Sequence, residues 1–124
     1  MTLYAHHLFI ADAQGNSAVV EWRLNNEFGG ETGYHMKVVD SPVCTNFWLC
    51  DGDTAGQCSR FDTLTRLLDE KPVNTPEDVM NNLEAASVKN TEWSCVYGLS
   101  DFSVEVALDN HYDRVYRFSP EDFQ

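Results

Sequence analysis

The start of the chain alternates between apolar and polar positions in a way that predicts a β-hairpin. An apolar run lies within residues 4–12, and residues 17–24 place Ala, Val and Trp on one face and Val, Glu and Arg on the other. Asp12 and Gly15 mark the turn between them, because an aspartate accepts local backbone hydrogen bonds and glycine readily adopts a positive φ. Two such runs joined by a glycine-containing turn are typical of a hairpin.

The hydrophobic pattern continues with two shorter segments. A short strand is expected over residues 34–39, after a loop or tight hairpin end over 25–33. Pro42 then interrupts the pattern, and residues 43–49 form another apolar run. A polar, glycine-containing loop over 50–57 closes this part of the chain.

The hydrophobic period then changes to that of a helix. Apolar residues recur at helical spacing over about 58–70, which predicts an amphipathic helix that ends before Pro72. A second helix is expected over about 76–88. Thr75 is a favourable N-cap for it, Pro76 suits the first helical position, and acidic residues follow in the first turn.

Three further strands are expected over residues 92–99, 103–108 and 114–118, separated by turn signals. The order of strands, two helices and strands predicts the α+β class. We expect a mostly antiparallel sheet with an antiparallel pair of helices on one face. The length is that of one ordinary domain, so a single domain is expected over residues 1–124.

The charge of the chain narrows the classes of partner. Eight Lys and Arg residues against 20 Asp and Glu residues give a formal net charge of −12. Such a surface repels phosphate backbones and anionic membranes, so neither nucleic acid nor a membrane is an expected partner. The chain has no apolar stretch of the ~20 residues that a membrane span needs. It also shows no basic region followed by an apolar one at its start, so no signal peptide is expected and the expected localisation is cytoplasmic.

The candidate chemistry in the residues themselves is sparse. The four cysteines form no CxxC pair and no zinc-finger spacing, so neither a metal nor another cofactor is expected, and the thiols are interpreted as free in a reducing compartment. The sequence has no GxSxG elbow and no glycine-rich phosphate loop. A Cys–His pair formed in space stays open, because the chain has four histidines. The residues alone therefore identify no active site.

Four segments, in order along the chain, resemble the choloylglycine hydrolase family of linear amide C–N hydrolases, which includes bile salt hydrolases and penicillin V acylases. Residues 7–21 resemble the family's hairpin, with an acid and a glycine in the turn and a glutamate in the second strand. Residues 43–47 (VCTNF) resemble its V-x-TN strand end, residues 59–61 (SRF) its helix start, and residues 91–97 (TEWSCVY) a late strand. The family belongs to the N-terminal nucleophile (Ntn) hydrolases. The resemblance covers the later half of a member and so implies half of an αββα sandwich.

Two residues gain a catalytic role through this resemblance. Asn46 matches the asparagine whose side-chain amide helps to bind the oxyanion of the tetrahedral intermediate, and an uncharged N–H donor suits that task. Arg60 matches an active-site arginine that supports the surroundings of the nucleophile electrostatically. Glu21 and Trp93, which also lie in matched segments, are interpreted as structural.

The family's nucleophile has no counterpart in this sequence. It is a cysteine at the N-terminus of the mature chain, whose own α-amine acts as the base. Thr2, which removal of Met1 would expose, precedes the hairpin, in a region that the family uses for a later strand. The resemblance therefore implies the C-terminal portion of a cysteine-nucleophile hydrolase that is inactive alone. Its partner would be the missing N-terminal half, and its substrate, once reconstituted, a small-molecule amide.

Two other interpretations stay open. The first is a non-catalytic binding module derived from the same fold. Half of a sandwich would expose a sheet face and a strand edge, which favours self-association as a homodimer. The second is an unrelated α+β domain in which the four motifs coincide by chance.

Overall fold

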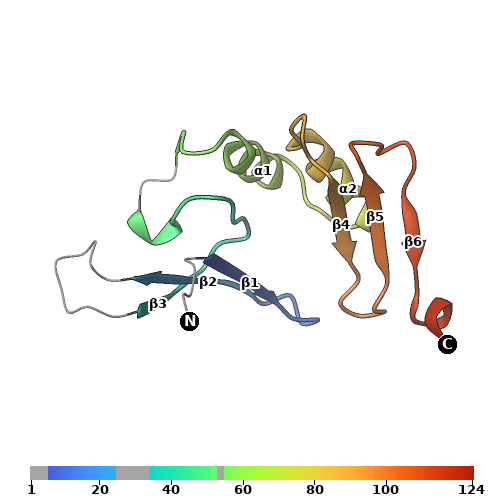
Figure 1. Cartoon of the computed structure of the whole chain (residues 1–124), viewed down its shortest axis with the longest axis horizontal. Coiled ribbons are helices and arrows are strands. Elements are labelled where there is room, and N and C mark those ends of the chain that lie inside the picture. Colours follow the sequence, from blue (N-terminus) through green and yellow to red (C-terminus); the bar gives the residue numbers. More distant parts are fainter. Residues whose placement is uncertain (1–5, 25–33, 53–54) are drawn as a thin grey trace. The chain divides into compact units, whose positions relative to one another are not determined.

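The computed structural model describes residues 6–24, 34–52 and 55–124. The chain divides into two compact units, Met1–Cys58 and Ser59–Gln124, and each is considered by itself. The first unit contains strands β1 to β3, and the second contains helices α1 and α2 and strands β4 to β6 (Figure 1). Each unit holds one three-stranded antiparallel sheet, so the predicted α+β class is confirmed. The expected single domain over 1–124 stays a prediction.

The sheet of the first unit has the order β1-β2-β3. Its strands are β1 (His6–Ala11), β2 (Ser17–Leu24) and β3 (Tyr34–Val39). The predicted hairpin is confirmed, and its turn is built as expected. The Asp12 carboxylate accepts hydrogen bonds from the backbone N–H of Gln14 at 3.0 Å and of Asn16 at 2.9 Å, and Gly15 has φ +88°.

The segment after β3 departs from the expected strand end. Residues 43–48 form no strand, and a 3-10 turn follows at Leu49–Asp51. Side chains satisfy backbone groups here, since the Ser41 hydroxyl bonds both the N–H and the carbonyl of Val43, and the Glu21 carboxylate accepts the N–H of Leu49. Such bonds compete with a strand ladder. The strand end expected at Asn46 is therefore wrong, and Asn46 lies in a bend.

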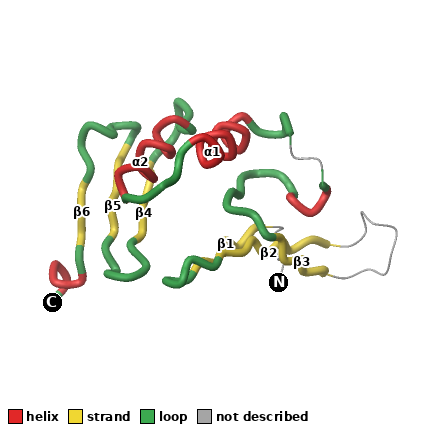
Figure 2. Tube along the Cα trace, turned by 180° about the vertical axis from the view of Figure 1, so that it is seen from behind, coloured by secondary structure: helices red, strands yellow, loops and turns green. Residues whose placement is uncertain are grey.

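The second unit is a helix pair and a sheet built around an apolar core. Its helices are α1 (Ser59–Glu70) and α2 (Pro76–Ala85), and its strands are β4 (Trp93–Tyr97), β5 (Val104–Leu108) and β6 (Tyr116–Phe118), in the order β4-β5-β6. Helix α2 contacts α1 and lies against one side of the sheet at β4, which the two opposite views show (Figures 1 and 2). Met80 of α2 packs there with Val96 and Ala107. All three predicted strands form, each slightly shorter than expected.

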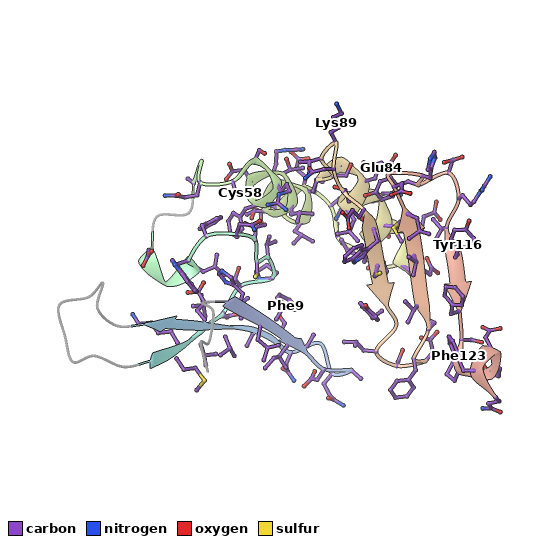
Figure 3. The ribbon with its side chains drawn as sticks, in the orientation of Figure 1. Phe9, Cys58, Glu84, Lys89, Tyr116 and Phe123 are labelled. Atoms are coloured by element: carbon purple, nitrogen blue, oxygen red, sulfur yellow. The ribbon has the colours of Figure 1, made fainter. Side chains whose placement is uncertain are left out.

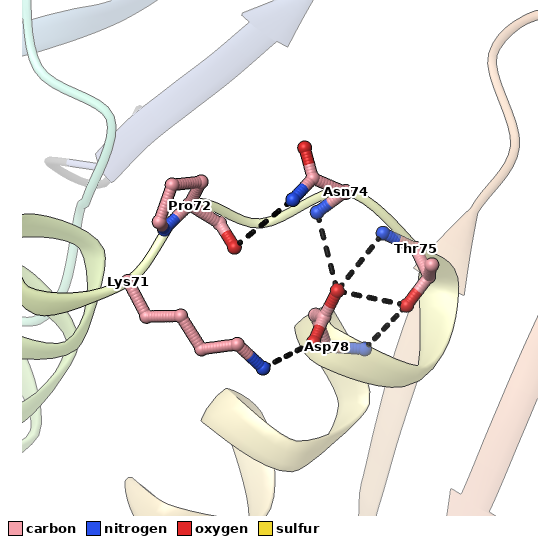
Figure 4. A network of polar contacts seen from close by, with 5 residues as sticks. All are labelled: Lys71, Pro72, Asn74, Thr75 and Asp78. Atoms are coloured by element: carbon pink, nitrogen blue, oxygen red, sulfur yellow. Dashed lines mark hydrogen bonds and ion pairs between the residues drawn. The ribbon is translucent and has the colours of Figure 1, made fainter.

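The start of α2 confirms the predicted helix-start signals (Figure 4). The Thr75 hydroxyl accepts the N–H of Asp78 at 3.1 Å, and the Asp78 carboxylate accepts the N–H of Thr75 at 3.2 Å. The same carboxylate accepts the N–H of Asn74 and pairs with the Lys71 ammonium at 2.7 Å. The helix thus begins on a reciprocal capping box, whose bonds occupy N–H groups that a helix start leaves unpaired.

Among the helices of the described residues, none has the length and apolar character to cross a membrane.

Candidate functional site

A polar cluster in the first unit combines a carboxylate, an imidazole and a thiol. It consists of His7 of β1, Glu21 of β2, and Cys44 and Trp48 of the segment after β3, and we call it the Glu21 cluster. The hairpin register places His7 directly opposite Glu21. Opposite residues of antiparallel strands share a face, so the register alone brings the imidazole to the carboxylate.

Glu21 is the centre of the cluster. It is 1% exposed, and its carboxylate accepts the backbone N–H of Leu49 at 2.6 Å. On the neighbouring strand, Lys37 is its partner in the β2–β3 register. A buried carboxylate needs hydrogen bonds or cations to offset the loss of water, and both kinds of group lie around this one. The bond to Leu49 also joins the sheet to the segment that follows β3.

His7 connects the carboxylate to an aromatic ring of the same segment. Its Nδ1 lies 3.2 Å from Glu21 Oε1, within ion-pair distance but without the geometry of a hydrogen bond. Its ring stacks on that of Trp48, with centroids 4.9 Å apart and planes inclined by 27°. Glu21 and His7 therefore both hold the segment around residues 48–49 onto the sheet.

Cys44 does not have the electronic character of a nucleophile. Burial raises the pKa of its thiol above the ordinary 9.0, and the nearby Glu21 charge raises it further. The thiolate is the reactive form of cysteine, so a raised pKa keeps Cys44 protonated and unreactive near neutral pH. Beside it, Thr45 Oγ1 is buried and has no hydrogen-bond partner in the part of the chain that the structure describes. The raised pKa therefore argues against Cys44 as the nucleophile of a Cys–His pair.

The structure places the two expected catalytic residues in different units. Asn46 lies in the bend of the first unit and is exposed, two residues before Trp48 of the Glu21 cluster. Arg60 is the second residue of α1 in the second unit and is half-buried. Each is therefore described within its own unit. Asn46 is close to the Glu21 cluster in the chain, because Cys44 and Trp48, each two residues away, belong to that cluster.

The second unit contains a separate open cavity of about 500 Å³. Glu77 and Asn81 of α2, Glu105 of β5 and Arg117 of β6 contribute to its lining. Arg117 already lies 3.3 Å from the Glu105 carboxylate and 3.7 Å from that of Asp101. The positive charge of Arg117 is therefore neutralised by carboxylates of the same unit, which makes this cavity a weaker candidate for a binding site than the Glu21 cluster.

Among the described residues, no group of three or more His, Cys, Asp or Glu side chains is arranged to hold a metal ion.

Sequence reasoning did not find the contacts of the Glu21 cluster. It assigned Glu21 a structural role, and it gave His7 no role beyond that of one of the four histidines of the chain. The missing signal was present in the hairpin, because a turn centred between Asp12 and Asn16 fixes His7 opposite Glu21. Contacts with Cys44 and Trp48 depend on how the segment after β3 folds back, and no local pattern encodes that.

Comparison of the chain with protein-family models, with curated proteins and with solved structures finds no match in any of the three. The likeness to the choloylglycine hydrolase family therefore rests on the four motifs of the sequence.

Proposed function

We propose that this chain is the C-terminal portion of a cytoplasmic cysteine-nucleophile hydrolase of linear amide C–N bonds, with Asn46 and Arg60 as catalytic residues. The observation that carries the proposal is the anchoring of the segment that bears Asn46 by a buried carboxylate. Glu21 is 1% exposed and holds the N–H of Leu49, three residues after Asn46.

The anchoring matters because an oxyanion donor acts through preorganisation. A donor already fixed where negative charge develops stabilises the transition state without reorganisation, and a small displacement is costly. On either side of Asn46 the segment is fixed, since Val43 is 4% exposed and Leu49 is 6% exposed, whereas Asn46 between them is exposed. This pattern presents an amide side chain from a rigid backbone, which is what an oxyanion site requires.

The proposed reaction follows from these roles. A cysteine thiolate supplied by the N-terminal half attacks the amide carbonyl carbon, and the Asn46 side-chain N–H donates to the resulting oxyanion. The C–N bond then breaks and the protonated amine leaves, after which water attacks the thioester and releases the carboxylic acid and the free thiol. Arg60 supplies positive charge to the surroundings of the nucleophile. Cys44 does not replace that nucleophile, because burial and Glu21 raise the pKa of its thiol. The chain by itself is therefore expected to be inactive.

Co-expression with the polypeptide encoded directly upstream of Met1 tests the proposal. Release of free amine is measured with glycine-conjugated bile salts, penicillin V and simple acyl amides. We expect hydrolysis by the pair and none by this chain alone. Asn46→Ala in the active pair should lower kcat by about 10²–10³ with little change in KM. Asn90→Ala, an exposed turn position in the second unit, is the matched control and should leave kcat unchanged. An inactive pair, or full activity in Asn46→Ala, would overturn the proposal.

A second candidate function, a non-catalytic module that binds a copy of itself, is favoured by a different observation. Both sheets carry large apolar side chains on exposed positions. In the first unit Leu8, Ile10, Met36 and Val38 are between 49% and 65% exposed. Exposed apolar surface of this kind marks sites of protein association. Light scattering of the purified chain tests this function, and a monomer at ~100 µM, well above the Kd of an ordinary specific interface, would contradict it.

A further inference from the structure

One face of the sheet in the second unit consists entirely of uncharged, mostly large side chains. The register β4–β5–β6 places alternate residues on the same face, opposite the one that packs on α2 through Val96 and Ala107. We call it the aromatic face, and its members are Trp93, Cys95, Tyr97, Val104, Val106, Leu108, Tyr116 and Phe118. The two charged residues of these strands, Glu105 and Arg117, are register partners on the other face and lie 3.3 Å apart.

The aromatic face is exposed over a substantial area. Trp93 is 63% exposed, Tyr97 65%, Tyr116 43% and Phe118 39%. The C-terminal 3-10 turn extends it, because Phe123 is 78% exposed and its ring centroid lies 6.2 Å from that of Phe118 (Figure 3). With 150–250 Å² for each aromatic side chain, these five rings expose on the order of 600 Å².

That area is at the upper end of the apolar patches of ordinary monomers, and it is most of what one partner contributes to a stable protein interface. A standard interface buries roughly 800 Å² on each side, and the largest apolar patch of an ordinary monomer is about 300–600 Å². The half-buried Val104 and Val106 and the 45% exposed Leu108 add to the aromatic contribution. The aromatic face is therefore large enough to form the centre of a dimer interface.

The uncharged character of the aromatic face argues for a second copy of the chain as the occupant. The net charge of −12 opposes anionic lipid and nucleic acid, and it opposes a second copy as well wherever acids would meet. The aromatic face places no acid opposite another, and charges outside it are screened beyond about 10 Å in 0.1 M salt. An uncharged apolar face is complementary to itself, which is what a two-fold symmetric interface requires.

We propose that the aromatic face of β4, β5 and β6 is a self-association surface, on which the same face of a second copy docks about a two-fold axis. The inference deepens the second proposed function, on which it rests, and does not require the hydrolase activity. The two sheets then form a sandwich across the interface, with tyrosine hydroxyls and the tryptophan N–H able to reach water or a partner at its rim.

Sedimentation equilibrium of the full chain and its variants tests the proposal. We expect the wild type to be a dimer at micromolar concentration. Tyr97→Glu should raise the dissociation constant by at least about 30-fold, because it replaces a 65% exposed aromatic side chain of the interface by a charge. Val88→Glu is the matched control, since Val88 is 40% exposed, lies between α2 and β4 outside both sheets and acquires the same charge. It should leave the dimer unchanged. An equimolar mixture of Tyr97→Glu and Tyr97→Lys should recover dimers.

The outcomes separate the surface from the function. A monomeric wild type overturns both the self-associating module and its surface. This holds also if hydrogen exchange of the monomer shows that the same chain covers the aromatic face. A dimer that survives Tyr97→Glu, or that Val88→Glu also dissociates, overturns the surface and leaves the module. If circular dichroism shows that Tyr97→Glu is unfolded, the folded Tyr97→Ser variant decides by the same criterion, with weaker association expected.

Discussion

The two units of the chain organise their interiors by different means. Among the described residues of the first unit, the largest side chain that is almost wholly removed from solvent is the carboxylate of Glu21, and Val19, two positions earlier on β2, is buried as well. In the second unit the buried centre is apolar, formed by Met80, Val96 and Ala107. The polar network of the second unit, around Asp78, lies on an exposed helix start instead.

This difference indicates where a specific geometry is being maintained. Burying a carboxylate is unfavourable unless hydrogen bonds and cations surround it, whereas apolar burial is favourable in itself. The first unit uses its buried carboxylate to hold one backbone N–H and one imidazole, and thereby fixes the segment that bears Asn46. The second unit achieves stability by apolar packing and helix capping. Asn46, the candidate catalytic residue, thus lies in the unit whose interior contains a buried carboxylate.

The largest expected effect comes from removing the buried carboxylate. Glu21→Ala leaves the N–H of Leu49 without its acceptor and removes the carboxylate beside His7, in a site where Glu21 is 1% exposed. We expect a loss of about 4 kcal/mol in the free energy of unfolding, as for other buried polar pairs that lose one member. Urea titration gives this loss, and hydrogen exchange should show that residues 43–51 open first.

Glu105→Ala provides the matched control in the second unit. Glu105 also lies on a strand, but the side chain beside its carboxylate is Arg117, which is 59% exposed. Its removal should reduce the free energy of unfolding by less than about 1 kcal/mol. Equal losses in the two variants would show that the interiors do not differ in the way proposed here.

The next effect concerns the apolar centre of the second unit. Met80 is 5% exposed and packs on Val96 and Ala107, so Met80→Ala removes buried surface and leaves a cavity. We expect a loss of about 3 kcal/mol, whereas Met80→Leu, which keeps the volume, should lose less than about 1.5 kcal/mol. Thermal unfolding followed by circular dichroism measures both. A similar loss in the two variants would contradict an interior stabilised by close apolar packing.

Sequence rules described the second unit better than the first, and the reason is physical. The start of α2 at Pro76 and its N-cap at Thr75 follow from local interactions among a few consecutive residues, which a sequence displays directly. The hairpin of β1 and β2 is local in the same sense. The segment after β3 is determined by Glu21, which contacts Leu49 28 positions later in the chain. Such a contact depends on the folded chain, so the apolar run over 43–49 wrongly favoured a strand end at Asn46.

A smaller effect tests the capping of α2. Thr75→Ala removes the hydroxyl that accepts the N–H of Asp78, and we expect a loss of about 1 kcal/mol in the free energy of unfolding. Thr75→Ser keeps an acceptor at the same position and should remain close to wild type. Urea titration measures both variants. If alanine and serine behave alike, the hydroxyl contributes nothing to the stability of the second unit.

The smallest effect is a pH dependence at the same helix start. Hydrogen bonds from Lys71, and then from Thr75, lower the pKa of Asp78 from its ordinary 3.8 to about 2. A carboxyl with a depressed pKa in the folded state contributes stability that is present above the unfolded pKa. That stability is lost as the pH falls through the folded one. The stability difference between wild type and Asp78→Asn should therefore be constant above about pH 5 and diminish between about pH 4 and 2.

Lys71→Met removes the largest cause of the lowered Asp78 pKa, so the Asp78 carboxyl should titrate closer to 3.8 in an NMR experiment. An unchanged midpoint in Lys71→Met would show that the exposed ion pair of the second unit, unlike the buried carboxylate of the first, has no measurable influence on its surroundings.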